Sequence, residues 1–434
     1  MHRKDASGER SNISFYSALA VNHCTSSGTT DYHMQIFGSF SGTAPDDLSG
    51  KFYFPVVLAA IGIAISLFSF PFLSEMPSYL DQARSLADGN LIDPGLGYST
   101  PIGYPGLLSA FYSMGGVSGI IVFQSLVHLG ITCFCWRILR KCGVSSALIG
   151  IGTLIISLHP HILLNIKRIN EGALASLVIL LILDNLIRAP RSNTGSIILG
   201  IYHSILILLR PNAITLIPLA VYCIHSVSRN MKSSLRNLTL TIITGATFYL
   251  GFSKFVTSSF LFWPKNGPYN FFAGNNQFTA SSLLENQNAE QSIKPALENA
   301  GYLPESAYDI SGSEYNELAI SFITSEPIEF IRLIFLKCYV FFSPRLANAD
   351  NFIEFFLQAA LASFPVIWLC LIAFYSRRKY TNLDKALIVL VLLYTAPFLI
   401  TNADPRMRLP LDVVFILHSL ILLDRNSPYK INPA

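Results

Sequence analysis

Charged residues are scarce in this chain. Asp, Glu, Lys and Arg together make up 13% of its 434 residues, whereas hydrophobic residues make up 51%. A soluble globular domain carries about 25% charged residues. Because so few ionic side chains cannot cover a water-exposed surface of this size, the composition argues against a soluble domain and favours a protein embedded in lipid.

Several chemical signatures are also absent from the sequence. Walker and dinucleotide glycine loops, Gly-x-Ser-x-Gly elbows and zinc patterns do not occur. The seven cysteines stand at irregular positions, so no disulfide framework is predicted. His159 and His161 are two residues apart and would point to different helix faces, which favours core or interfacial histidines over metal ligands. We therefore predict no metal and no other cofactor, with a divalent cation left open.

Long apolar runs predict an all-α polytopic membrane protein. Phe52–Leu73 lacks charge over the length of about 20 residues that a bilayer-crossing helix needs. Backbone groups in lipid must be satisfied internally, so these runs are helices. We expect about ten spans; the others are Leu107–Trp136, Ser145–Ile166, Gly172–Leu183, Ile197–Leu209, Ile214–Val227, Leu238–Ser253, Phe355–Tyr375, Ala386–Thr401 and Val413–Leu423. Within Leu107–Trp136 we predict a short piece before Gly115–Gly116 and the span itself after that pair.

One apolar segment leaves the number of spans open. Ser325–Phe342 is either an eleventh span, with Arg332 and Lys337 in lipid, or a helix at the membrane surface. We prefer the interfacial helix, because it keeps the basic segment 377–379 cytoplasmic.

Basic residues between the spans set the expected orientation, since short loops rich in Lys and Arg stay cytoplasmic. They form four groups: Arg137/Arg140/Lys141, Arg188/Arg191, Arg229/Lys232/Arg236 and Arg377/Arg378/Lys379. This places two loops, 74–104 and 262–351, on the non-cytoplasmic side. Residues 1–50 are then a polar, disordered cytoplasmic leader, followed by one transmembrane domain over 51–434. No basic cluster lies on a soluble domain, so nucleic acid is not an expected partner.

The first outer loop carries several candidate functional residues. Glu75 follows the first span directly, where a partly desolvated carboxylate could act as a general base. The alternative is a solvated charge that holds the helix end in place. Tyr79 and neighbouring apolar positions predict a short amphipathic surface helix that ends at Gly89. On that helix Asp81 fits a solvated face, and Arg84 either binds an anionic group or reaches lipid phosphates.

Three further sites carry charge next to predicted spans. Arg406 and Arg408, in the segment Asn402–Asp412, form a compact cationic site suited to phosphate or to lipid head groups. Glu171 is either a functional carboxylate or the i,i+4 partner of Lys167. Arg210 interrupts an apolar run before Pro211, which predicts either a helix break at a cavity or a plain turn.

The order of these motifs resembles the GT-C glycosyltransferases, in the bacterial branch related to protein O-mannosyltransferases and the lipid A aminoarabinose transferase. The resemblance covers about Phe52 to Leu423, since each motif keeps its place relative to the spans. The motifs are Glu75 four residues before Tyr79, TPIGYPGLL at Thr100–Leu108, Glu171, LRPNA at Leu209–Ala213, AGNN at Ala273–Asn276, SEPIEF at Ser325–Phe330 and PRMRLPL from Pro405.

The resemblance implies a GT-C-like bundle with interfacial helices on its outer face, in a bacterial inner membrane. It implies an inverting transfer of one sugar from a polyprenyl-phosphate donor to a glycan, lipid or protein acceptor outside the cell. Glu75 takes the place of the family's acidic base, usually Asp, while Arg406 and Arg408, helped by Arg84, take the place of donor-phosphate ligands. The remaining candidates for the site are Tyr79, Asp81, Tyr104, Glu171, Arg210 and Asn275.

The chain departs from the family pattern at several positions. Met407 stands where relatives have an aromatic residue, and Ile102 replaces a proline. Ser99 and Thr100 stand where relatives often have Lys or Arg, so either the three arginines supply the missing charge or activity has been lost. Two other hypotheses stay open: a transporter or flippase of lipid-linked saccharide, and an O-antigen polymerase or ligase that uses a lipid-diphosphate donor.

Overall fold

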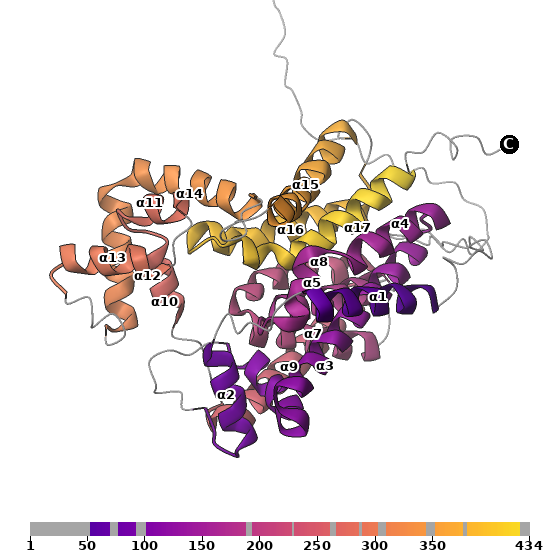
Figure 1. Cartoon of the computed structure of the whole chain (residues 1–434), viewed down its shortest axis with the longest axis horizontal. Helices are drawn as coiled ribbons and strands as arrows, with labels where there is room; N and C mark the ends of the chain where they lie inside the picture. Colours follow the sequence, from indigo (N-terminus) through magenta and orange to yellow (C-terminus); the bar gives the residue numbers. More distant parts are fainter. Residues whose placement is uncertain are drawn as a thin grey trace, which may run out of the picture. The chain divides into compact units, whose positions relative to one another are not determined.

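All regular elements in the described part of the chain are helices (Figure 1). The computed structural model describes residues 53–69, 77–92, 101–187, 193–227, 230–260, 266–285, 289–302, 310–343, 352–375 and 380–425. No strand occurs in these ranges. The all-α prediction is therefore confirmed, whereas the expected leader at 1–50 lies outside the described residues.

The helices follow the apolar runs of the sequence closely. In chain order they are α1 (Tyr53–Ser69), α2 (Pro77–Ala87), α3 (Gly103–Lys141), α4 (Ser146–Ser157), α5 (Pro160–Lys167), α6 (Gly172–Ile187), α7 (Asn193–Leu209), η2 (Pro211–Leu216), α8 (Ile217–Val227), α9 (Met231–Thr257), α10 (Asn266–Ala273), α11 (Thr279–Leu284), α12 (Ala289–Asn299), α13 (Gly312–Ser325), α14 (Pro327–Phe342), α15 (Phe352–Tyr375), α16 (Asn382–Ile400), η4 (Pro405–Arg408) and α17 (Leu409–Arg425).

Three helical segments among the described residues are long and apolar enough to cross a membrane. They are Gly103–Lys141, Ser146–Lys167 and Asn382–Ile400. Shorter apolar helices are Tyr53–Ser69, Gly172–Ile187, Asn193–Leu209, Pro211–His225 and Ser363–Tyr375. These segments, together with the low charge content, identify a helical chain with the composition of a membrane protein.

Two sequence-predicted helix boundaries are confirmed. The amphipathic helix predicted within residues 74–104 is α2, and the chain turns directly after it at Gly89, which has a φ of +87°. α3 is interrupted at Gly115 and Gly116, where the backbone leaves helical geometry and Gly116 has a φ of +57°. Only glycine adopts such angles without strain, so this pair separates a short first piece of α3 from its long apolar part.

Hydrogen bonds and ion pairs connect helix ends to one another at two places. We call these places the Glu171 end and the Asp384 end. At the Asp384 end, Lys141 of α3 pairs with Asp184 of α6, and Asp424 of α17 accepts a hydrogen bond from the Ser145 backbone before α4. At the Glu171 end, α6 begins beside the end of α7 through the Glu171–Arg210 ion pair. α3 and α4 thus run in opposite directions, and so do α6 and α7.

Helices α10 to α14, which we call the 266–343 region, have a small core of their own. Phe272, Ile293, Leu297 and Tyr315 are buried within it. α14 leaves this core and packs against α16 and η4. The region is therefore held at the Glu171 end, next to the segment that carries Arg408.

Candidate functional site

Glu171 lies where α6 begins, and local sequence explains its position. The Asn170 side chain accepts a hydrogen bond from the Gly172 backbone at 2.6 Å, which caps the start of α6. The Glu171 carbonyl accepts from Ala175, so its backbone already belongs to the helix. Its carboxylate is buried, and only 5% of the residue is exposed. A buried carboxylate requires compensating charge and hydrogen bonds.

Arg210 supplies that compensation from the end of α7. Pro211 has no backbone N–H and ends the helix there, and Arg210 adopts an extended conformation with φ −143° and ψ 95°. Its Nη2 lies 3.0 Å from Oε1 of Glu171. Its Nη1 donates to the Tyr394 hydroxyl at 2.7 Å and to the Met407 carbonyl at 2.8 Å. One guanidinium thus connects α6, α16 and η4.

Two tyrosines from the first outer loop complete this group. Tyr79 of α2 is buried, its ring packs edge-to-face on Tyr104 at 5.3 Å, and its hydroxyl donates to Glu171. Burial raises the pKa of the Tyr79 phenol well above its usual value, and the Glu171 carboxylate raises it further. Tyr104, at the start of α3, accepts a hydrogen bond from Gln124 at 2.8 Å. We call Tyr79, Tyr104, Gln124, Glu171, Arg210 and Tyr394 the Glu171 cluster.

The Glu171 cluster retains unused hydrogen-bonding capacity. Arg210 Nε and Gln124 Oε1 are buried, and neither has a hydrogen-bond partner in the described part of the chain. Buried polar groups are normally satisfied.

The segment that carries the predicted cationic motif is held from two sides. Arg210 and Tyr394 both bond the Met407 carbonyl. Arg408 is completely buried; it donates to Asp412 at 2.8 Å and to the Phe341 and Ser343 carbonyls at the end of α14. These contacts favour a role for Arg408 in holding this segment in place. The side chain of Arg406 lies outside the described residues.

His161 extends the Arg408 contacts into α5. Its Nδ1 lies 3.4 Å from Oδ2 of Asp412, and His159 packs against it at a ring distance of 6.0 Å. Both histidines are buried, as expected for core residues. Among the described residues, no group of three His, Cys, Asp or Glu side chains has the geometry to hold a metal ion.

Asn275 contacts Lys337, the residue whose charge left the number of membrane spans open in the sequence. The Asn275 amide donates to the Ile400 carbonyl at 2.8 Å, and its Oδ1 accepts from Lys337 of α14 at 3.0 Å. Lys337 is 0% exposed. A signal for it was present, because it is a single charge inside the apolar sequence IFLKCYVFF, but that sequence does not reveal its partners.

Other predicted residues lie apart from the Glu171 cluster. Asp81 and Arg84 are exposed on α2, on the side of the helix that faces away from the buried Tyr79. Arg84 donates to the Tyr112 hydroxyl at 3.1 Å. Glu75 lies outside the described residues, so its role as a base stays a prediction. Glu171 pairs with Arg210 in place of the i,i+4 partner Lys167 that the sequence offered.

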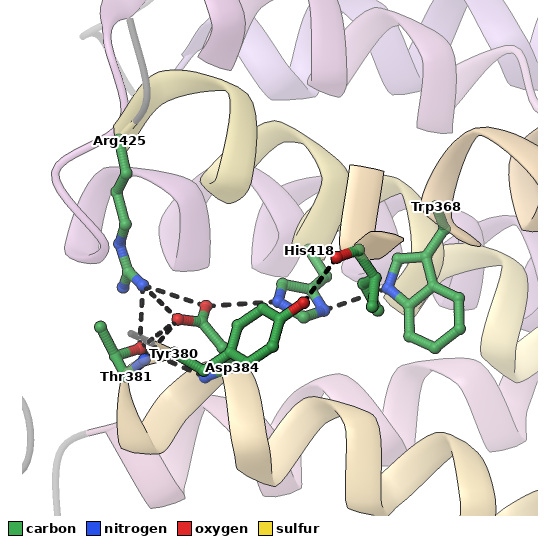
Figure 2. Close-up of polar contacts among 7 residues, drawn as sticks. Trp368, Tyr380, Thr381, Asp384, His418 and Arg425 are labelled. Atoms are coloured by element: carbon green, nitrogen blue, oxygen red, sulfur yellow. Dashed lines mark hydrogen bonds and ion pairs between the residues drawn. The ribbon is translucent and has the colours of Figure 1, made fainter. Parts of the chain in front are cut away.

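A second polar network at the Asp384 end serves as a comparison (Figure 2). Trp368 donates to Nδ1 of His418 at 3.0 Å, and Nε2 of His418 lies 3.2 Å from Oδ1 of Asp384. Arg425 and Thr381 also donate to the Asp384 carboxylate. This network joins α15, α16 and α17 and has partners for each of these side chains. It is therefore suited to holding these three helices together.

Comparison with models of known protein families and with curated proteins gives no match for this chain.

Proposed function

We propose that this chain is an inverting glycosyltransferase of the GT-C type. It moves one sugar from a polyprenyl-phosphate donor to a glycan, lipid or protein acceptor on the non-cytoplasmic face of a membrane. The proposal combines the order of motifs in the sequence with the meeting of their residues at one end of the helices.

The alternation of helix ends supports about ten membrane crossings. The proposed crossings are α1, α3, α4 with α5, α6, α7, η2 with α8, α9, α15, α16 and α17. The basic group at 137–141 adjoins the Asp384 end, where Arg137 and Lys141 pair with Asp184. Because short basic loops stay cytoplasmic, the Glu171 end faces the other side, where a lipid-linked sugar is presented.

One observation carries the proposal. Tyr79, Tyr104, Glu171 and Arg210 come from four separate segments that the resemblance singles out, and all four side chains meet in one buried cluster. The same cluster bonds Met407, which lies between the two arginines of the cationic motif.

Covalent geometry brings the proposed base and the proposed phosphate ligand near the same cluster. Glu75 is four residues before Tyr79, so their Cα atoms are separated by at most about 14 Å. Arg406 directly precedes Met407, whose carbonyl is bonded by Arg210. A carboxylate tethered four residues from Tyr79 and a guanidinium tethered next to Met407 are within reach of an acceptor hydroxyl and a donor phosphate bound near this cluster.

The proposed reaction is a direct displacement. The acceptor hydroxyl oxygen attacks the anomeric carbon and transfers its proton to the Glu75 carboxylate. The bond between the anomeric carbon and the phosphate oxygen breaks, and its electron pair leaves with the polyprenyl phosphate. Arg406, with Arg84, stabilises that leaving anion. The Glu171 cluster fixes α2 and η4 relative to each other, which keeps base and donor aligned.

The test is transfer by purified protein in detergent with radiolabelled polyprenyl-phosphate sugars. Glu75→Gln should lower the rate by at least a hundredfold, since a general base contributes about 10²–10⁴-fold. Glu317→Gln, an exposed change on α13, is the matched control and should leave the rate unchanged.

Two further arms separate the competing hypotheses. Turnover of a polyprenyl-diphosphate oligosaccharide, with none of the monophosphate donor, would favour a polymerase or ligase. Movement of labelled lipid across proteoliposomes without sugar transfer would favour a flippase. Full transfer by Glu75→Gln would remove Glu75 as the base.

A further inference from the structure

Lys337 lies at the centre of the contact between the 266–343 region and the end of α16. Its Nζ donates to Oδ1 of Asn275 at 3.0 Å and to the Ile400 carbonyl at 3.4 Å. Asn275 bonds the same Ile400 carbonyl, and Gly274 packs so closely on Thr401 that no side chain would fit between them. All three contacts therefore involve Ile400 or Thr401, the residues that lead into η4.

The partners of Lys337 suit a neutral amine. An ammonium group has three N–H donors, whereas a neutral amine has two. The described residues offer Lys337 two acceptors, the oxygens of Asn275 and Ile400, and both are uncharged. Burial of an ammonium without an opposite charge is costly. Burial lowers the pKa of Lys337 to about 7.

No described carboxylate compensates the Lys337 charge. The charged groups on α14 itself are Glu329 and Arg332, which pair with each other near its exposed start. On the elements packed against α14, the charged side chains are Arg408 on η4, Asp404 before it, Glu314 and Glu317 on α13, Glu285 after α11, and Asp384 and Lys385 at the far end of α16. Among the described residues none of these is hydrogen-bonded or ion-paired to Lys337.

We propose that Lys337 is a positioning residue whose protonation controls how firmly the 266–343 region holds the Ile400–Arg408 segment. The docked arrangement buries the amine, whereas opening returns it to water. Because water stabilises the ammonium form, protonation favours opening. The segment so released carries Met407 and Arg408, and with them the contacts of the Glu171 cluster with η4.

The sign of the pH dependence follows from linkage. Below pH 7 the amine is protonated in both arrangements, and docking is at its weakest. Between about pH 7 and the ordinary lysine value of 10.5 the open form holds a proton that the docked form lacks. In that window each pH unit raises the docking constant by up to about tenfold.

Hydrogen exchange on the full-length protein in detergent tests this without any need for activity. The amides of Asn275, Asn276 and the 400–408 segment should gain protection as pH rises from 7.5 to about 9.5, by up to about tenfold per unit after correction for intrinsic exchange. Amides of the buried Val413–Leu417 stretch of α17 provide the internal reference.

Two substitutions of Lys337 sharpen the test. Lys337→Met should remove the pH dependence and give higher protection than wild type at pH 7. Lys337→Arg stays charged throughout and should show low protection at every pH. A flat wild-type profile would overturn the proposal, and so would a slope that survives in Lys337→Met. If the protein also catalyses transfer, its rate should rise over the same pH range; absence of transfer bears on the proposed function and leaves the exchange result standing.

Discussion

Arg210 Nη2 lies 3.0 Å from Glu171 Oε1, and both side chains are buried at the meeting point of α6, α7, α16 and η4. The pair also receives Tyr79 from α2, so it fixes α2 to the segment that carries the cationic motif. The contribution of this pair to the free energy of unfolding can be measured.

Removal of one member of this pair should be more harmful than removal of both. Arg210→Met or Glu171→Gln alone leaves an uncompensated buried group and should cost about 3–5 kcal/mol in free energy of unfolding. The double variant should lose clearly less than the sum of the two. Thermal or denaturant unfolding in detergent, arranged as a double-mutant cycle, measures the coupling. Additive losses would show that the pair is not a unit.

The close approach of Gly274 to Thr401 predicts a sharp contrast between two glycines. A Cβ at position 274 would lie 1.7 Å from the Thr401 carbonyl oxygen, so Gly274→Ala must push the turn away from α16. We expect a loss of about 1–3 kcal/mol from overpacking. Gly267→Ala on α10 is the control, because nothing lies within 4 Å of its Cβ. Equal unfolding temperatures for the two variants would contradict the contact.

The network around Asp384 should matter for stability and not for donor binding (Figure 2). Asp384→Asn removes the charge that Arg425 and His418 share, which should lower the free energy of unfolding by about 3 kcal/mol. Below its unfolding temperature the variant should keep the wild-type KM for the lipid-linked donor, because the network lies at the opposite helix ends. A changed KM with unchanged unfolding would reverse this assignment.

α14 offers a test of the number of spans. Ile328, Phe335 and Tyr339 follow one face of this helix and are 83%, 72% and 60% exposed, while Leu333 and Lys337 on the other face are buried. If α14 is an interfacial helix with its apolar face in lipid, the tryptophan fluorescence of the variant Phe335→Trp should be quenched most by lipids that carry bromine near the head groups.

The eleven-span alternative predicts a different depth for the same reporter. Strongest quenching by bromine near the middle of the acyl chains would support it. Glu317→Trp, exposed on α13, is the matched control and should show little quenching by either lipid.

The sequence by itself determined the long apolar helices and several of their ends. Apolar runs without charge gave the long helices, because a backbone in an apolar surrounding must satisfy its own hydrogen bonds. Pro211 marked the end of α7, and Gly89 and Gly115–Gly116 marked the turns, since these residues change the allowed backbone angles. Local rules of this kind need no knowledge of distant residues.

Tertiary structure alone decided which charges meet. The nearest partner of Glu171 in sequence is Lys167, yet the carboxylate pairs with Arg210, and Tyr394 joined them without any signal in its apolar run. Burial makes an ion pair depend on the geometry of several packed helices, and that geometry is set by the whole bundle. For the same reason Lys337 could be recognised from sequence as an unusual charge, while its pairing with Asn275 and Ile400 emerged only when the helices were packed together.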